Sequence, residues 1–250
     1  MRTSREGLQL QRKMVEERSR GQRPRKHLLH EVPPEPGDGS SFVWNLACEE
    51  ELLRLQQAAG FAGRALRCGR MVWEHFASPS EVSELRAFAE ESFQELHHRG
   101  AEVSLVLPSQ CDPGTSAGPM GIETSALLDR VRAAVSGVAK ADLHLRAALL
   151  RRVQLPAITG PRQLMPEHDS FAAHADRATV AAYHYSAVLY LSGADEFQDG
   201  ELAFMDSDAE VVLAAAKGRL LAFSSGLENL HRVVPPIGGP RYVLAMWFGL

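Results

Sequence analysis

The sequence has little of several features that would assign it to a specialised class of protein. Only three cysteines occur in 250 residues, too few and too scattered for a disulfide-rich scaffold or a cysteine-based zinc site. No apolar run approaches the roughly 18 residues of a membrane span, and the first residues lack the apolar stretch of a signal peptide. The net charge is −4, so no overall basic character indicates nucleic acid. We expect no membrane span and no nucleic-acid partner.

What is present is the composition of an ordinary globular protein, with 45% hydrophobic and 23% charged residues. The length suits one domain of about 200 residues with a tail. The first 26 residues carry nine Lys or Arg, three Glu and no aromatic residue. Such a segment buries too little apolar surface to fold alone, so residues 1–41 are predicted to be a disordered basic tail and linker.

Two helices are predicted in the next part of the chain. In residues 78–98, Ser78 and Glu81 match a capping box, and apolar residues then recur at helical spacing. Residues 123–140 have the same amphipathic pattern. We therefore expect residues 42–141 to form the helical N-terminal part of the folded domain.

After residue 142 the pattern changes to short apolar runs separated by Gly, Pro, Asp and Asn. Such spacing is typical of an antiparallel sandwich or barrel. The fold class predicted is mostly β with flanking N-terminal helices, and residues 142–250 form the β core. The expected strands are residues 143–155, 185–192, 200–206, 218–225 and 241–248.

One group of polar residues carries the chemistry. In FAAHADRA, His174 and Asp176 are separated by one residue, and in an extended segment such residues point to the same side. His231 follows 57 positions later, after a predicted strand that a sandwich can return to the first pair. Two imidazoles and one carboxylate form the triad that binds non-haem iron(II), although zinc, nickel or copper could bind the same groups.

Arg241 begins the last predicted strand, ten residues after His231. A guanidinium in an apolar strand is costly unless it meets an anion, and its planar fork fits a carboxylate. The far carboxylate of 2-oxoglutarate is a natural partner, because its 2-oxo acid end can chelate iron. Tyr190 could add a hydroxyl to the same carboxylate. The alternatives are that Arg241 pairs with a surface acid and that Tyr190 is a core residue.

The HxD…H motif followed by a basic residue resembles that of the Fe(II)/2-oxoglutarate-dependent oxygenases of the prolyl hydroxylase superfamily. The runs YSAVLYLS, DGELAFMD and FSSGLENLHRV also resemble the prolyl 3-hydroxylases. The resemblance implies a double-stranded β-helix (jelly roll), with His174, Asp176 and His231 as catalytic metal ligands. It implies that Arg241 and Tyr190 bind 2-oxoglutarate and that Trp247 packs beside the pocket.

The same resemblance implies a dioxygenase that hydroxylates an aliphatic C–H bond and decarboxylates 2-oxoglutarate to succinate. Its cofactors would be Fe(II), 2-oxoglutarate and O2, with L-ascorbate left open. A peptide or protein substrate of the prolyl type follows from kinship alone. Substrate choice is expected to depend on loops 101–121 and 156–184.

Two other readings stay open: a catalytically silent β-sandwich binding module, and a cupin-type metal enzyme that does not use 2-oxoglutarate. The intact triad argues against the first, and Arg241 with Tyr190 argues against the second. Localisation is also open. The relatives suggest a membrane-anchored enzyme of the ER or Golgi lumen, where Cys48 and Cys68 could form a disulfide, and the cytoplasm is the alternative. The sequence predicts no oligomeric state.

Overall fold

The structure, a computed structural model of the chain, describes part of its length. The described residues are 5–20, 25–27, 40–48, 50, 67–95, 102–107, 122–154 and 172–250. Most of the two loops expected to choose the substrate, residues 108–121 and 155–171, lies outside the described residues. The same holds for most of the predicted linker, residues 28–39.

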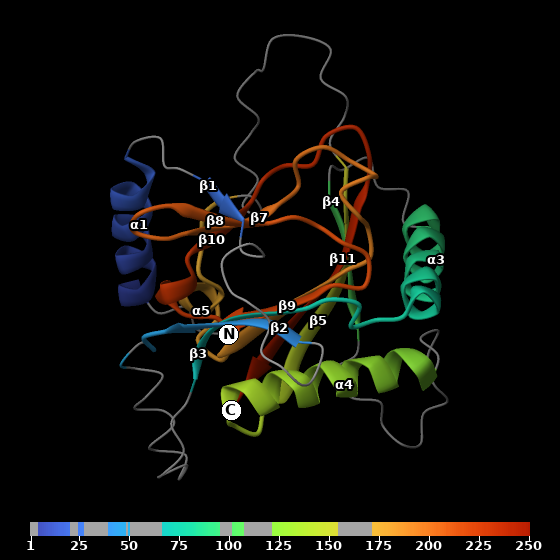
Figure 1. The fold of residues 1–250 in the computed structure, drawn as a ribbon, viewed down its shortest axis with the longest axis horizontal. Helices are drawn as coiled ribbons and strands as arrows, with labels where there is room; N and C mark the ends of the chain where they lie inside the picture. Colours follow the sequence, from blue (N-terminus) through green and yellow to red (C-terminus); the bar gives the residue numbers. More distant parts are fainter. Residues whose placement is uncertain are drawn as a thin grey trace.

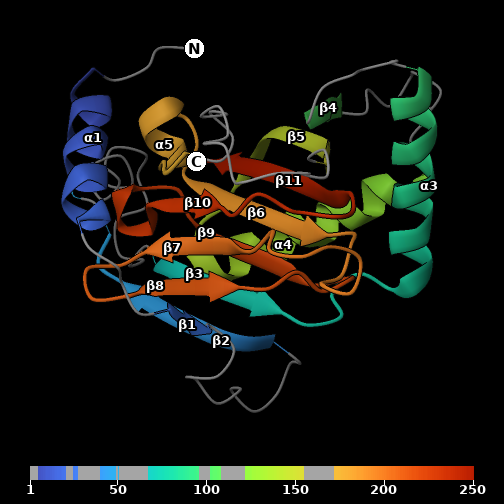
Figure 2. The same cartoon turned by 90° about the horizontal axis from the view of Figure 1, so that it is seen from above.

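Two β-sheets form the centre of the molecule (Figures 1 and 2). Every neighbouring pair in the larger sheet is antiparallel. Its seven strands are, in spatial order, β2 (Ser40–Leu46), β3 (Cys68–Trp73), β9 (Leu220–Ser224), β6 (Tyr185–Tyr190), β11 (Arg241–Gly249), β5 (His144–Val153) and β4 (Glu102–Leu107).

The smaller sheet has four short strands, and two of its three neighbouring pairs are antiparallel. The remaining pair, at one edge of this sheet, is parallel. The strands are, in spatial order, β1 (Arg25–His27), β8 (Glu210–Leu213), β7 (Leu202–Met205) and β10 (His231–Val233).

Helices flank the sheets. Figure 1 shows α3 (Pro79–Glu95) and α4 (Ile122–Ala139) against the larger sheet, and α1 (Arg5–Ser19) at the opposite end of the molecule from α3. The short helix α5 (Asp176–Thr179) lies beside α1 in both views. A 3-10 turn, η2 (Leu227–Asn229), leads into β10.

The alternation of side chains along β11 separates two apolar layers. Tyr242 and Leu244 pack with α3 and α4 in the outer layer. Val243 packs with Tyr190 and Phe204 in the inner layer, between the two sheets. Because side chains at i and i+2 share a face, Arg241 is on the inner face with Val243. Strand parity therefore turns this guanidinium toward the interior of the sandwich.

The five strands and two helices predicted from apolar patterning are all present, within a few residues of the expected bounds. The N-terminal part departs from expectation. Residues 5–19 form α1, where a disordered tail was predicted, because Met14 packs against a small apolar cluster of Ala175, Ala178 and Leu227. Burial against the rest of the protein thus orders a segment that could not fold alone.

The segment 42–141 is not only helical, and this is a second correction. It also supplies β2 (from Ser40), β3 and β4 to the larger sheet. Pairing of β3 with β9 explains the difference, since strand pairing with distant residues leaves no periodic signal in the local sequence. The division of the chain at residues 41 and 141 stays a prediction.

Cys48 and Cys68 form a disulfide, with their Cα atoms 5.2 Å apart. Cys68 begins β3, and Cys48 follows the end of β2, so the bond ties these antiparallel partners together. Within the described part of the chain, no helix combines the length and apolar character that crossing a bilayer requires.

Candidate metal site

His174 and Asp176 reach one point because of the single residue between them. Ala175 is extended, with φ −116° and ψ 129°, and Asp176 opens helix α5. An extended residue at this position turns its two neighbours to the same side. His174 and Asp176 therefore converge as expected, although Asp176 is already the first residue of α5 and not part of an extended segment.

Backbone pairing brings the third residue, His231, next to His174. It is the first residue of β10, and it forms an isolated antiparallel bridge with His174. The His174 N–H donates to the His231 carbonyl at 2.8 Å, and the His231 N–H donates back at 2.9 Å. This bridge holds the centroids of the two imidazole rings 4.5 Å apart.

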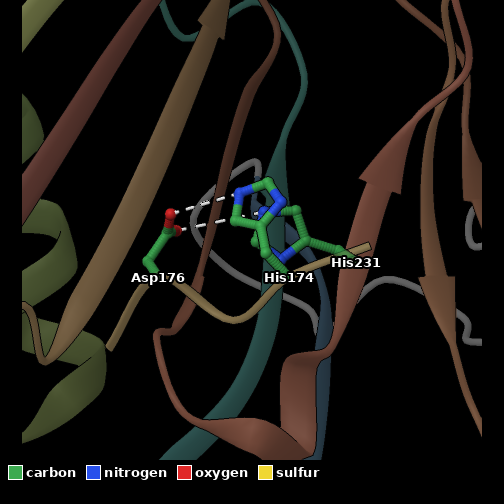
Figure 3. Close-up of side chains that lie close together, drawn as sticks. All are labelled: His174, Asp176 and His231. Atoms are coloured by element: carbon green, nitrogen blue, oxygen red, sulfur yellow. Dashed lines mark ion pairs between the residues drawn. The ribbon is translucent and has the colours of Figure 1, made fainter. Parts of the chain in front are cut away.

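The three side chains face one another (Figure 3). His174 Nε2 lies 3.6 Å from Asp176 Oδ1, and His231 Nε2 lies 4.0 Å from Asp176 Oδ2. All three ligand atoms are within 4.8 Å of one another. These separations suit one shared ion, whose bonds to nitrogen or oxygen are about 2 Å long.

Backbone carbonyls orient both imidazoles with Nε2 toward the site. Nδ1 of His174 lies 2.8 Å from the Ala172 carbonyl, and Nδ1 of His231 lies 2.9 Å from the Asn229 carbonyl. A carbonyl only accepts, so Nδ1 of each neutral ring donates and Nε2 keeps its lone pair toward the site. Such a second partner is the usual companion of a metal-bound histidine.

The charges of the triad also favour a cation. Burial alone would raise the pKa of Asp176, but the nearby imidazoles and the Ser186 hydroxyl outweigh it and hold that pKa far below its usual range. Burial lowers the pKa of His231 to about 4. Burial also opposes protonation of His174, but Asp176 outweighs it and raises the His174 pKa. An ionised carboxylate beside a neutral imidazole suits metal binding, which requires deprotonated ligands.

Ser186 is a site residue that the sequence reasoning missed. Its hydroxyl donates to Asp176 Oδ2 at 2.6 Å and lies 2.7 Å from the Ser225 hydroxyl. Ser186 is buried on β6, on the same face as Tyr190. A serine within the apolar run YSAVLYLS could have indicated a partner, because an unpaired hydroxyl in a buried strand costs free energy.

Arg241 and Tyr190 lie together in the interior, as predicted. Both are buried, and the guanidinium carbon is 5.4 Å from the centroid of the Tyr190 ring. Burial lowers the pKa of Arg241 and raises the pKa of Tyr190. Within the described residues, Arg241 Nε and the Tyr190 hydroxyl have no hydrogen-bond partner. Two unsatisfied buried polar groups fit an acidic ligand such as a carboxylate.

A second cation, Arg151, approaches the same interior. It lies on β5 opposite Val243 of β11, so it shares the inner face with Arg241. Burial and the positive charge of Arg241 lower the Arg151 pKa, whereas Asp176 raises it. The sequence reasoning missed Arg151 because LRAALLRRV contains three arginines and no local pattern distinguishes the inner one.

Trp247 lies on the inner face of β11, as expected. Its ring stacks on Tyr183, with centroids 5.4 Å apart and planes 19° from parallel. Its buried indole N–H has no acceptor among the described residues. The pair adds an aromatic surface to the inner face of the strand that begins with Arg241.

The N-terminal helix also contacts the triad. Gln11 of α1 accepts a hydrogen bond at 3.0 Å from the N–H of Ala175, the residue between His174 and Asp176. Arg18 of the same helix donates to the Met205 carbonyl at 2.7 Å. A segment expected to be a tail therefore supports the loop that carries two of the three candidate ligands.

Comparison with known proteins identifies this arrangement. Residues 162–249 match the family model of the 2OG-Fe(II) oxygenase superfamily. The matched segment contains His174, Asp176, His231 and Arg241. The human 2-oxoglutarate and iron-dependent oxygenase domain-containing protein 3 is 31% identical over 115 residues, 45% of this chain and 34% of that protein. Human prolyl 3-hydroxylase 2 is 45% identical over 69 residues, 26% of this chain and 10% of that protein.

Solved structures confirm the predicted fold. A Pseudomonas putida prolyl-4-hydroxylase superimposes with a TM-score of 0.50 at 22% identity, covering 79% of this chain and 98% of that one. HygX from Streptomyces hygroscopicus gives 0.50 at 15% identity, covering 82% and 88%. The double-stranded β-helix of these oxygenases is therefore the fold of this chain.

The curated relatives are much longer than the matching part. The rat oxygenase domain-containing protein 3 is matched over 26% of its length, at 36% identity. The family name includes Fe(II) and 2-oxoglutarate, and the side chains of His174, Asp176 and His231 suit the metal.

Proposed function

We propose that this protein is a 2-oxoglutarate-dependent dioxygenase that hydroxylates an aliphatic C–H bond. The observation that carries the proposal is the convergence of His174, Asp176 and His231 beside a buried guanidinium. Each residue type matches its role: two imidazoles and one carboxylate for iron(II), and Arg241 for an acid. The family match over residues 162–249 supports the same reaction class.

His174, Asp176 and His231 would hold the metal at one face and leave other coordination positions free. Bound iron(II), with 2-oxoglutarate and dioxygen, would supply oxidation of a C–H bond to an alcohol, coupled to conversion of 2-oxoglutarate into succinate and carbon dioxide. The protein's own contribution is to orient the reactants and to exclude water from the space between the sheets.

Arg241 and Tyr190 would bind the distal carboxylate of 2-oxoglutarate. The unsatisfied Arg241 Nε and Tyr190 hydroxyl are donors buried where such a carboxylate would accept. A cupin-type enzyme without an acidic co-substrate has no use for this pair, since leaving buried donors unsatisfied costs free energy. This observation favours the dioxygenase over that alternative.

For the substrate we propose a peptide or protein, with proline as the first residue to test. Prolyl 3-hydroxylase 2 and a prolyl-4-hydroxylase are among the similar proteins, and their names supply the reason for the choice. Fold alone does not select among substrates, so the assay should begin with proline-containing peptide libraries.

The first experiment measures succinate formed from 2-oxoglutarate with Fe(II) and ascorbate, and its inhibition by N-oxalylglycine. Wild-type protein should form succinate, and His174→Ala and Asp176→Ala should not, while all three keep the same circular dichroism spectrum. Succinate formation by both variants would refute the ligand assignment. Its absence in wild-type protein with iron bound would favour the silent binding module.

A second experiment tests the carboxylate clamp. Arg241→Ala should weaken 2-oxoglutarate binding by 10-fold or more, as about 1.5–3 kcal/mol for a charged hydrogen bond implies. Arg86→Ala is a matched control, because the Arg86 guanidinium stacks over Tyr242 on the opposite face of β11. Equal affinities of the two variants in a calorimetric titration would contradict the role of Arg241.

We further propose that the protein works in an oxidising compartment. The Cys48–Cys68 disulfide supports this location, since disulfides are rare where thiols are kept reduced. Intact mass with and without reductant, after alkylation of free thiols, should reveal two more alkylated cysteines in the reduced sample. The same number in both samples would argue for the cytoplasmic alternative.

A further inference from the structure

A buried arginine of β3 lies outside every role described so far. Arg70 has a side chain with 0% exposure, and burying a guanidinium is costly unless it is paired. Its two terminal nitrogens donate to the carboxylate of Asp206, at 2.9 and 2.6 Å. Asp206 follows β7, so this ion pair joins the two sheets through the interior of the sandwich.

The third donor of Arg70 points toward the metal site. Its Nε donates to Asn229 Oδ1 at 2.7 Å. The amide nitrogen of Asn229 donates in turn to the carbonyl of Ser224 at 2.8 Å and to its hydroxyl at 2.9 Å. Both ends of the Asn229 side chain are therefore fixed, and Asn229 itself is fully buried.

Asn229 connects this network to a candidate ligand. Its backbone carbonyl lies 2.9 Å from His231 Nδ1 and selects the ring form with the lone pair on Nε2. The Arg70 guanidinium also lies 3.9 Å from the centroid of the Phe204 ring, which is a neighbour of His231. A polar chain and an aromatic contact thus both lead from Arg70 to His231.

We infer that Arg70 is a positioning residue for the metal site, acting through Asn229 to hold His231 Nε2 toward Asp176. The inference rests on the proposed metal site. Arg70 does not touch the reacting atoms. Its contribution is to fix the turn η2, so that the carbonyl of Asn229 stays within hydrogen-bond distance of the imidazole.

Arg219 is a matched control from the same protein. It is also buried, at 8% exposure, and its guanidinium pairs with Glu74 at 3.0 Å. The Arg219 guanidinium also donates to the backbone carbonyl of Ala214. Neither Glu74 nor Ala214 belongs to the metal site. Arg70→Met and Arg219→Met therefore each remove a buried, ion-paired arginine, but only the first removes a link to His231.

The experiment titrates Co(II), a spectroscopic substitute for Fe(II), into wild type and both variants, with visible absorption as the readout. Arg70→Met should weaken Co(II) binding 10- to 100-fold, the usual effect of losing a partner of a metal ligand. Arg219→Met should stay within threefold of wild type at a similar melting temperature. Equal Co(II) affinities in the two variants would overturn the inference.

The metal-free protein provides a second readout. Long-range proton–nitrogen NMR should show His231 protonated at Nδ1 in wild type and in Arg219→Met, and a mixture of ring forms in Arg70→Met. An unchanged ring form would overturn the inference even if Co(II) affinity fell. If Co(II) fails to bind wild type, the proposed metal site fails, while this NMR comparison still tests Arg70.

Asp206→Asn covers the case in which Arg70→Met does not fold. Asp206 is half-buried, with 19% of its side chain exposed, and asparagine keeps its volume while removing the ionic bond to Arg70. The variant should lose a smaller part of the Co(II) affinity, about 3- to 10-fold. Wild-type affinity together with a wild-type His231 ring form would refute the role of Arg70.

Discussion

The two sides of the candidate metal site are held in different ways. His231 exposes only 6% of its side chain, and Arg70 of β3 supports it through Asn229. His174 exposes 26% of its side chain and lies on a short loop. The backbone N–H of Ala175 in this loop is hydrogen-bonded to Gln11 of α1. His231 therefore belongs to the strand core, whereas His174 lies on a loop that is held by its bridge to His231 and by α1.

This difference has an energetic consequence. A residue inside packed strands is positioned by cooperative interactions that disappear only when the domain unfolds. A residue on a loop is positioned by a few contacts, which can open locally at a smaller free-energy cost. We therefore expect changes on the His231 side to affect stability and metal binding together, and changes on the His174 side to affect metal binding with less effect on stability.

Removing a ligand should produce the largest effect and test this asymmetry. His174→Ala and His231→Ala should each weaken Co(II) binding by more than the about 100-fold that loss of an outer partner can cost. Only His231→Ala should also lower stability of the metal-free protein, by about 2–4 kcal/mol, because it leaves a cavity and an unpaired Asn229 carbonyl. Urea unfolding of both variants measures the difference, and equal losses would contradict the comparison.

Breaking the disulfide should give the next largest effect, on the His231 side. Cys48 and Cys68 are 20 positions apart in the sequence, and Cys68 lies on the strand that carries Arg70. Replacing both with serine should lower the free energy of unfolding by about 3 kcal/mol, by constraining the unfolded chain less. The urea midpoint gives the measurement, with Cys111→Ser as the control. A wild-type midpoint in the double variant would show that the bond does not form in solution.

Mild acid should destabilise the protein through His184. Burial, then Arg177 and Arg146, lower the pKa of this imidazole to about 4, and its Nδ1 accepts the N–H of Leu250 at 2.9 Å. The unfolded chain protonates near the ordinary pKa of 6.5, so this stabilisation is complete above pH 6.5 and is lost as pH falls toward 4.

The effect between pH 7 and pH 5 should be roughly 1 kcal/mol, after allowance for solvent screening. His184→Asn keeps an acceptor for Leu250 without a titratable ring, and should lose that part of the pH dependence. Parallel urea midpoints of wild type and this variant across the pH range would exclude His184 as the cause.

The smallest effect is expected from α1. Gln11→Ala removes the acceptor of the Ala175 N–H, at a cost of about 1 kcal/mol, and should weaken Co(II) binding by up to about fivefold. Gln9→Ala is the matched control, since Gln9 is exposed on the same helix. Faster amide exchange at Ala175 in Gln11→Ala alone would support the contact, and identical exchange in both variants would contradict it.

Much of the fold and the site was predictable from local patterns. Short apolar runs between turn residues predicted β6 and β11, and the HxD spacing with His231 and Arg241 indicated the chemistry. The strand β3 and the helix α1 could not be predicted, because their stability comes from partners distant in the sequence. Ser186 and Arg151 were missed for the same reason, since their residue types become informative only where they face Asp176 and Arg241.

The sequence alone determined which functional groups were available and on which side of a strand each would lie, because side-chain direction follows backbone periodicity. The tertiary structure decided which of those groups meet. The bridge between His174 and His231 and the path from Arg70 through Asn229 join residues 57 or more positions apart. Contacts of that kind depend on strand register and on packing between sheets, which local patterning does not encode.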